Sequence, residues 1–174
     1  MMRIFRRLHF VPFWLGELLL LLVISVSCGF DERPSDKPAV LSSQVTILPQ
    51  SEFRYAVAPC SRKGPDGESA PWLPQAEDVI AAERRLNQYI SRRLDRPLSN
   101  YYRQYTGIVI NNRRFLYINA FEQPPTGKPA AESLPEWRTR FVAVCDGGDV
   151  SWGIEFDVEG KNFRNFSKNA VLGR

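Results

Sequence analysis

A chain of 174 residues, 44% of them hydrophobic and 12% aromatic, is long enough for one packed domain and too short for two comfortable ones. The formal net charge is +4, but residues 1–27 hold three Arg and one Glu, so the remainder has 20 basic and 18 acidic side chains, a net charge of +2. A surplus this small predicts no nucleic-acid partner.

The first 27 residues have the layout of a secretory signal. Arg3, Arg6 and Arg7 precede an apolar run, and small residues lead from that run to Cys28. The stretch "ISVSC", residues 24–28, resembles the lipobox of bacterial lipoproteins, in which a small residue precedes a Cys that is acylated and becomes the new N-terminus. The family usually has Leu where Ser25 stands. The resemblance implies that residues 1–27 are a signal peptide and that Cys28 is the lipidation site.

An uncleaved signal anchor is the alternative, because residues 10–30 number 21, about the length that spans a bilayer. Glu17 interrupts this run, and a carboxylate near mid-membrane is costly, which favours cleavage. Plain cleaved secretion is the third possibility. For lipoprotein and anchor alike, Arg residues before the apolar run and none just after it predict an extracytoplasmic domain in the cell envelope, on the periplasmic side.

The number of cysteines agrees with export. Three Cys in an oxidising compartment would leave one thiol without a disulfide partner. Lipidation of Cys28 removes this difficulty and leaves Cys60 and Cys145 as a pair. We therefore predict a disulfide between these two, with two buried free thiols as the alternative.

Residues 28–43 are rich in Asp, Pro, Ser and Lys and predict a flexible tether before a single domain, residues 44–174. In that domain, residues 45–47 and 53–58 have the alternation of short strands, and residues 61–74 predict a loop. Apolar residues then recur at spacings of three and four from about residue 74 to 94. This spacing predicts a helix that ends before Pro97.

After this helix the hydrophobic period changes to two. Residues 101–110 and 113–121 flank an Asn-Asn pair and predict a β-hairpin. Residues 137–145 and 150–158 predict a second hairpin, reached through a long loop, residues 122–136, and followed by a short edge strand in "NFRNFS". The prediction is an α+β fold, one long helix packed on a curved antiparallel sheet of about four to five strands. Its element order resembles cystatin-like and nuclear-transport-factor-two-like folds.

Several common chemistries are excluded by what the sequence lacks. The only His is His9, in the targeting segment, so the exported domain has no Ser-His-Asp or Cys-His catalysis and no His-ligated zinc. No Gly-rich phosphate loop is present. The stretch "CDGGD", residues 145–149, has too few carboxylates for calcium and is interpreted as a glycine turn. We predict no metal and no cofactor.

Two groups of side chains are candidates for binding. Trp72 and Trp137 each lie near a Pro-rich loop and are candidates for the rim of a groove, with core or surface packing as the simpler interpretation. Arg113 and Arg114 belong to an Arg-rich region, residues 84–114, that is either an anion-binding surface or an ordinary solvated face.

Glu155 and Asp157 have strand spacing and should share a face of the sheet, most simply a solvated one. The sequence therefore favours a non-enzymatic, membrane-tethered binding or assembly module, with an envelope protein or an acidic ligand as its partner. The alternative is a small envelope hydrolase or isomerase that uses Glu155, Asp157, Tyr105 and Tyr117 in a curved-sheet pocket.

Overall fold

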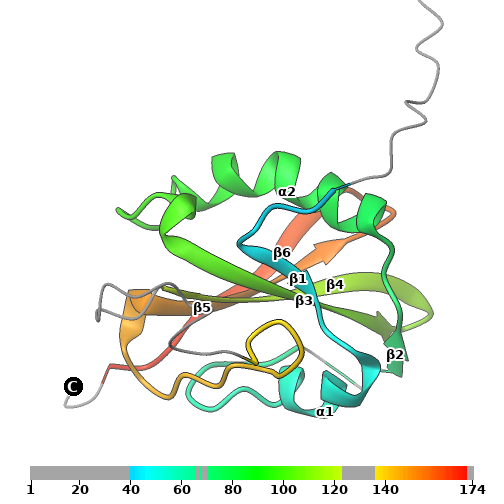
Figure 1. Ribbon diagram of the computed structural model, residues 1–174, viewed down its shortest axis with the longest axis horizontal. Coiled ribbons are helices and arrows are strands. Elements are labelled where there is room, and N and C mark those ends of the chain that lie inside the picture. Colours follow the sequence, from blue (N-terminus) through cyan, green and yellow to red (C-terminus); the bar gives the residue numbers. More distant parts are fainter. Residues whose placement is uncertain (1–39, 66, 68–69, 123–135, 172–174) are drawn as a thin grey trace, which may run out of the picture. The chain divides into compact units, whose positions relative to one another are not determined.

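The computed structural model describes residues 40–65, 67, 70–122 and 136–171 (Figure 1). The predictions for residues 1–27, Cys28, most of the tether and most of the 122–136 loop lie outside these residues. The elements are β1 (Val45–Ile47), η1 (Gln50–Glu52), α1 (Phe53–Ala56), β2 (Ala70–Trp72), α2 (Ala76–Ile90), η2 (Leu98–Asn100), β3 (Tyr101–Ile110), β4 (Arg113–Glu122), η3 (Gly148–Val150), β5 (Ser151–Asp157) and β6 (Asn162–Lys168).

The α+β class is confirmed, with one six-stranded sheet in the order β1-β3-β4-β5-β6 and with β2 also paired to β3. The sheet is mixed, because β1 runs parallel to β3 while every other pair is antiparallel. The prediction of a purely antiparallel sheet is therefore wrong at this edge. The reason lies in the connection, since the chain between β1 and β3 includes α2 and returns in the same direction.

The prediction of one long helix is wrong, since α2, the longest helix among the described residues, has 15 residues and is shorter than the apolar pattern. The Asp78 carboxylate accepts a hydrogen bond from the Gln75 N–H at 2.9 Å and caps the first turn. Beyond Ile90 the N–H groups of Arg93 and Leu94 both donate to the Ile90 carbonyl, at 2.8 and 3.0 Å, so the chain continues in turns. Leu94 stays buried, which explains why the sequence pattern extends past the helix.

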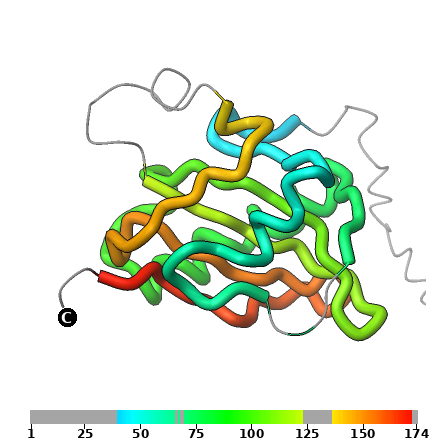
Figure 2. Tube along the Cα trace, turned by 90° about the horizontal axis from the view of Figure 1, so that it is seen from below, coloured from blue at the N-terminus to red at the C-terminus, as the bar shows by residue number. Residues whose placement is uncertain are grey.

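The sheet is covered on both faces. In Figure 1, α2 lies over one face and α1 lies on the opposite side. The α2 face holds the main core, in which Val79, Leu86 and Ile90 pack with side chains of the sheet. In Figure 2, which looks onto the other face, residues 136–147 cross the sheet beside the stretch that contains α1. This second cover buries side chains that an open sheet would expose to water.

The hairpin of β3 and β4 has the predicted register and turn. Asn111 and Asn112 have φ of 49° and 60°, the left-handed conformation that a two-residue hairpin turn requires. The second hairpin is not the predicted one, because β5 pairs with β4 and β6, and residues 137–145 form no strand. The edge strand expected in "NFRNFS" is confirmed as β6.

Two more short segments differ from their predictions. Residues 53–58 are not a strand, since η1 and α1 occupy residues 50–56, where Ala56 is buried and Tyr55 is exposed. The predicted loop at residues 61–74 contains β2, which adds to the free part of the β3 edge. Short segments of alternating residues take whichever conformation their tertiary contacts favour.

Candidate functional site

A depression of about 460 Å³ lies on the face of the sheet opposite α2, between residues 52–60 and residues 136–145. Its lining is formed by Glu52, Tyr55, Ala58, Cys60, Glu136, Arg140, Phe141, Ala143 and Cys145. The volume is within the range of about 300–1,000 Å³ that is usual for ligand sites in proteins. We call it the disulfide-side depression.

A buried carboxylate closes one end of this depression. The side chain of Glu52 is 6% exposed and accepts a hydrogen bond from the Phe141 N–H at 2.9 Å. Its other oxygen pairs with the Arg140 guanidinium at 3.3 Å. Both bonds join α1's side of the depression to the segment that follows residue 136, and they satisfy a carboxylate that burial would otherwise destabilise.

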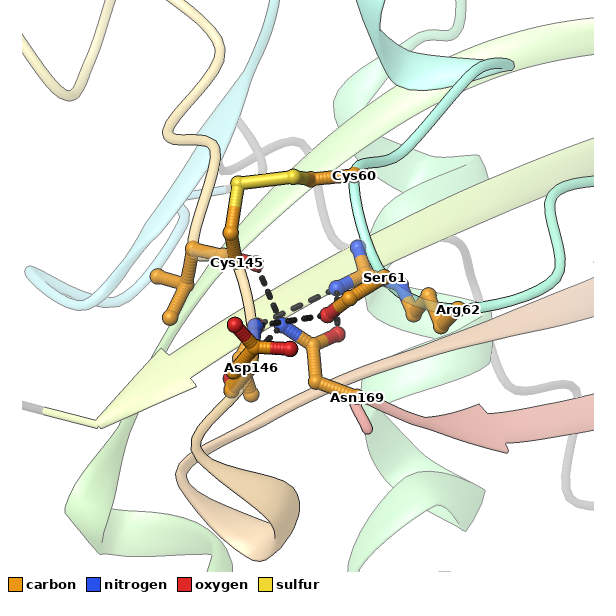
Figure 3. The surroundings of a disulfide bond; sticks show 8 residues. Cys60, Ser61, Arg62, Cys145, Asp146 and Asn169 are labelled. Atoms are coloured by element: carbon orange, nitrogen blue, oxygen red, sulfur yellow. Dashed lines mark hydrogen bonds between the residues drawn. A yellow bond between two sulfur atoms is a disulfide. The ribbon is translucent and has the colours of Figure 1, made fainter. Parts of the chain in front are cut away.

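The predicted disulfide closes the other end. Cys60 and Cys145 are bonded, with their Cα atoms 5.2 Å apart, so the alternative of two buried free thiols is wrong. Neighbouring residues reinforce the bond: the Asp146 N–H donates to Ser61 Oγ at 2.6 Å (Figure 3), and the Ala170 N–H donates to the Ser61 carbonyl at 2.9 Å. The Asn169 side-chain amide also donates to the carbonyls of Val144 and Asp146. Three separate segments are fixed at this point.

The backbone of residues 141–145 alternates between the sheet and the depression. Val142 bonds inward, since its N–H donates to Gln104 Oε1 at 2.9 Å and its carbonyl accepts from Asn119 Nδ2 at 3.0 Å. The Val144 carbonyl also bonds inward. Because the Phe141 N–H bonds to Glu52 at the depression and Val142 bonds toward the sheet, we infer that the N–H and C=O of Ala143, which lines the depression, face it. Among the described residues, neither group has a hydrogen-bond partner.

Three of the four predicted surface residues lie together at the β3–β4 turn. The Arg114 guanidinium is 5.1 Å from the centre of the Trp72 ring, and the Trp72 Nε1–H donates to the Phe115 carbonyl at 3.1 Å. Arg113 forms an ion pair with Asp157. These contacts give the turn end an aromatic and cationic surface.

Trp137 is not part of that surface. It is 2% exposed and packs edge-on against Tyr102, 5.0 Å away between ring centres, and against Phe121 at 6.3 Å. Phe121 stands near the end of β4 remote from the β3–β4 turn. The prediction that Trp137 forms part of a groove rim is therefore wrong, because its indole is buried against the second face of the sheet.

Glu155 and Asp157 share a face of β5, as predicted, but this face is not solvated. Glu155 is 0% and Asp157 4% exposed, and the side chains that lie against them come from β6 and from Arg113. Arg164 pairs with Glu155 at 2.7 Å, and Asn165 donates to its other oxygen at 2.9 Å. The two carboxylates are held in structural ion pairs rather than facing an open cleft.

The tyrosines of the enzymatic alternative lie on opposite faces of the sheet. Tyr117 opposes Glu155 in the β4–β5 register, whereas Tyr105 packs in the core beneath α2 and donates to Glu83. Burial, reinforced by the Glu83 charge, raises the pKa of Tyr105 well above its ordinary value, and burial raises the pKa of Tyr117 as well. Both phenols stay protonated at neutral pH, and the four candidate side chains do not converge.

The centre of the polar contacts on the second face is Arg62, which the sequence did not single out. Its guanidinium donates to four uncharged oxygens: Tyr117 Oη at 3.1 Å, Ser151 Oγ at 3.1 Å, Asn169 Oδ1 at 2.7 Å, and Asn119 Oδ1. The available signal was indirect, namely amide side chains in the middle of otherwise apolar strands. Such amides require polar partners when they are buried.

Within the described ranges, no helix has the length and apolarity to cross a membrane, and no group of three or more His, Cys, Asp or Glu side chains is placed to hold a metal ion. The chain matches no protein-family model, and no curated protein or solved structure shows significant similarity to it.

Proposed function

We propose that the protein is a membrane-tethered, extracytoplasmic binding module that takes an extended segment of an envelope protein into the disulfide-side depression. The observation that carries this proposal is the unpaired backbone of Ala143, which lies between the Glu52 contact and the disulfide. An added peptide strand recognises such N–H and C=O groups through main-chain hydrogen bonds.

The walls of the depression suit a peptide as well. Tyr55 is 45% exposed, and Phe141 lines the depression with it, so each offers ring surface to an apolar side chain. Arg140 and Glu136, at 64% and 76% side-chain exposure, supply both signs of charge. An extended partner would gain main-chain hydrogen bonds from Ala143 and side-chain contacts from these walls.

The proposed tether is supported by the sequence around Cys28 and by the disulfide between the other two cysteines. The lipobox-like stretch implies acylation of Cys28, and the disulfide uses both other cysteines, which leaves the Cys28 thiol for an acyl chain. Disulfides persist mainly in oxidising compartments, which agrees with a domain outside the cytoplasm.

Intact mass spectrometry of the protein purified from membranes tests the tether. We expect a chain that begins at an acylated Cys28, with Cys60 and Cys145 alkylated only after reduction. Cys28→Ser should abolish membrane retention, because it removes the thiol that would carry the lipid. A full-length mass that retains Met1, together with a Cys28→Ser protein that stays in membranes after an alkaline wash, would replace the lipid with a signal anchor.

Ala143→Pro tests the depression, because proline removes the N–H that a partner strand would accept from. Peptides selected for binding to the wild type from a displayed library of random sequences should bind this variant about tenfold more weakly, the loss of about one hydrogen bond. Affinities are measured by calorimetry, and hydrogen exchange should show the Ala143 amide becoming protected on binding.

Ala143→Ser is the matched control, since it keeps the N–H and should bind the same peptides as the wild type does. Both variants should keep the wild-type circular dichroism spectrum. Peptides that bind Ala143→Pro with unchanged affinity, or a wild type that selects no peptide, would contradict strand addition at this site.

A further inference from the structure

A second depression, of about 300 Å³, lies between the C-terminal half of α2 and the turn that joins β5 to β6. Its lining consists of Arg85, Gln88, Tyr89, Arg92, Lys161, Asn162 and Phe163. It belongs to the side of the sheet that α2 covers, so it is separate from the disulfide-side depression. We call it the basic groove.

The basic groove holds three cations and no carboxylate. The stretch "RRLNQYISRRL", residues 84–94, contains four Arg and no acidic residue, and two of these Arg, Arg85 and Arg92, line the groove. Of the acids close by in the sequence, Glu83 pairs with Arg103 at 2.7 Å, Glu159 lies 3.8 Å from Arg114, and the exposed Asp95 does not line the groove. The positive charge of the groove is therefore uncompensated by any described ion pair, which favours an anionic ligand.

One cation and the two aromatic rings of the groove have contacts that position them. The Arg85 guanidinium donates to the Lys161 carbonyl at 3.4 Å, which fixes Arg85 across the groove and leaves its remaining N–H groups for a ligand. Tyr89 and Phe163 form an aromatic floor with their ring centres 4.9 Å apart. The Arg93 guanidinium, 3.5 Å from the Tyr89 ring centre, holds that ring in place.

We propose that the basic groove binds a phosphate ester, with Arg85, Arg92 and Lys161 on the phosphate and the aromatic floor beneath the group to which it is esterified. Guanidinium groups match phosphate oxygens in pairs of parallel hydrogen bonds. The amides of Gln88 and Asn162 suit the hydroxyl groups of a glycerol or sugar. A groove of this volume is also too large for a bare phosphate ion. The same chemistry occurs in an anionic lipid headgroup and in a soluble phosphate ester.

The test is calorimetry on the full chain in neutral detergent, with three probes: inorganic phosphate, glycerol 3-phosphate and dihexanoyl phosphatidylglycerol. We expect the two esters to bind more tightly than inorganic phosphate, and Arg85→Gln with Arg92→Gln to weaken the esters about tenfold or more. Tighter binding of the short-chain lipid identifies a headgroup site, and equal or tighter binding of glycerol 3-phosphate identifies a soluble ligand. Both results support the proposal.

The matched control is Arg54→Gln with Arg84→Gln, which removes the same charge from exposed positions outside the groove and should leave binding of all three probes unchanged. Failure of every probe to bind at about 10 mM, or equal weakening in both double variants, would overturn the proposal. The result does not depend on strand addition, because Ala143→Pro should bind the phosphate esters as the wild type does.

Discussion

Removal of the Cys60–Cys145 disulfide is expected to lower the free energy of unfolding by about 4 to 5 kcal/mol. The bond joins residues 85 apart, so reduction returns to the unfolded chain the entropy of a long closed loop. Both cysteines are exposed, which means that replacing them with Ala removes little buried surface. Since a domain of this size has about 5–15 kcal/mol of stability in total, the variant should be marginally folded.

Urea unfolding followed by tryptophan fluorescence measures this loss in a Cys60→Ala, Cys145→Ala variant. Cys28→Ala is the control. Because Cys28 lies outside the loop that the disulfide closes, this substitution should leave the unfolding midpoint unchanged. Wild-type protein kept in reductant should unfold like the double variant. The native fold should survive at low urea, because the Ser61 bonds to Asp146 and Ala170 remain. A loss below about 1 kcal/mol would show that these bonds, and not the disulfide, hold the segments together.

The features that the sequence predicted correctly are those with local causes. The Asn111–Asn112 turn follows from the conformation that asparagine tolerates, and the register of β3 with β4 follows from that turn. The disulfide followed from counting cysteines after Cys28 was set aside. The core face of α2 followed from the spacing of its apolar residues.

The incorrect predictions concern segments whose partners lie far away in the sequence. Residues 137–145 alternate like a strand, but Gln104 and Asn119 bind the Val142 backbone in place of a neighbouring strand. The alternation of apolar and polar residues indicates which side chains share a face, but it does not indicate which groups form hydrogen bonds with the backbone. The same limit hid the disulfide-side depression, which exists because this segment stays outside the sheet.

The burial of Glu155 was also not predicted. A sheet with one helix was expected to leave its other face in water, and two-residue spacing is consistent with either a buried or a solvated face. Its partners, Arg164 and Asn165, come from β6 across a register shift, which no hydrophobic period in the sequence marks. Arg62 was missed because it stands in an irregular segment and its four acceptors come from three other parts of the chain.

Arg62→Ala is expected to destabilise the domain by about 3 to 5 kcal/mol, which is large for a side chain outside the apolar core. The guanidinium is the shared donor for acceptors on β4, on β5 and at Asn169, and its loss leaves Asn119 Oδ1 and Ser151 Oγ with one fewer partner in a covered site. Arg62→Lys should recover part of this stability, because an ammonium group keeps the charge and lacks the planar arrangement of donors.

Urea unfolding again gives the measurement, with Arg84→Ala as the control because Arg84 is exposed and should change stability by no more than about 0.5 kcal/mol. Gly153→Ala probes the same site, since a Cβ at this position would meet first the Tyr117 hydroxyl, which is a partner of Arg62, and then the Arg62 Nε at 2.7 Å. In the wild-type background we expect this substitution to cost about 1 to 3 kcal/mol through overpacking, and less in the Arg62→Ala background. Strictly additive losses would mean that the Tyr117 phenol alone, and not the Arg62 guanidinium, opposes the added methyl group.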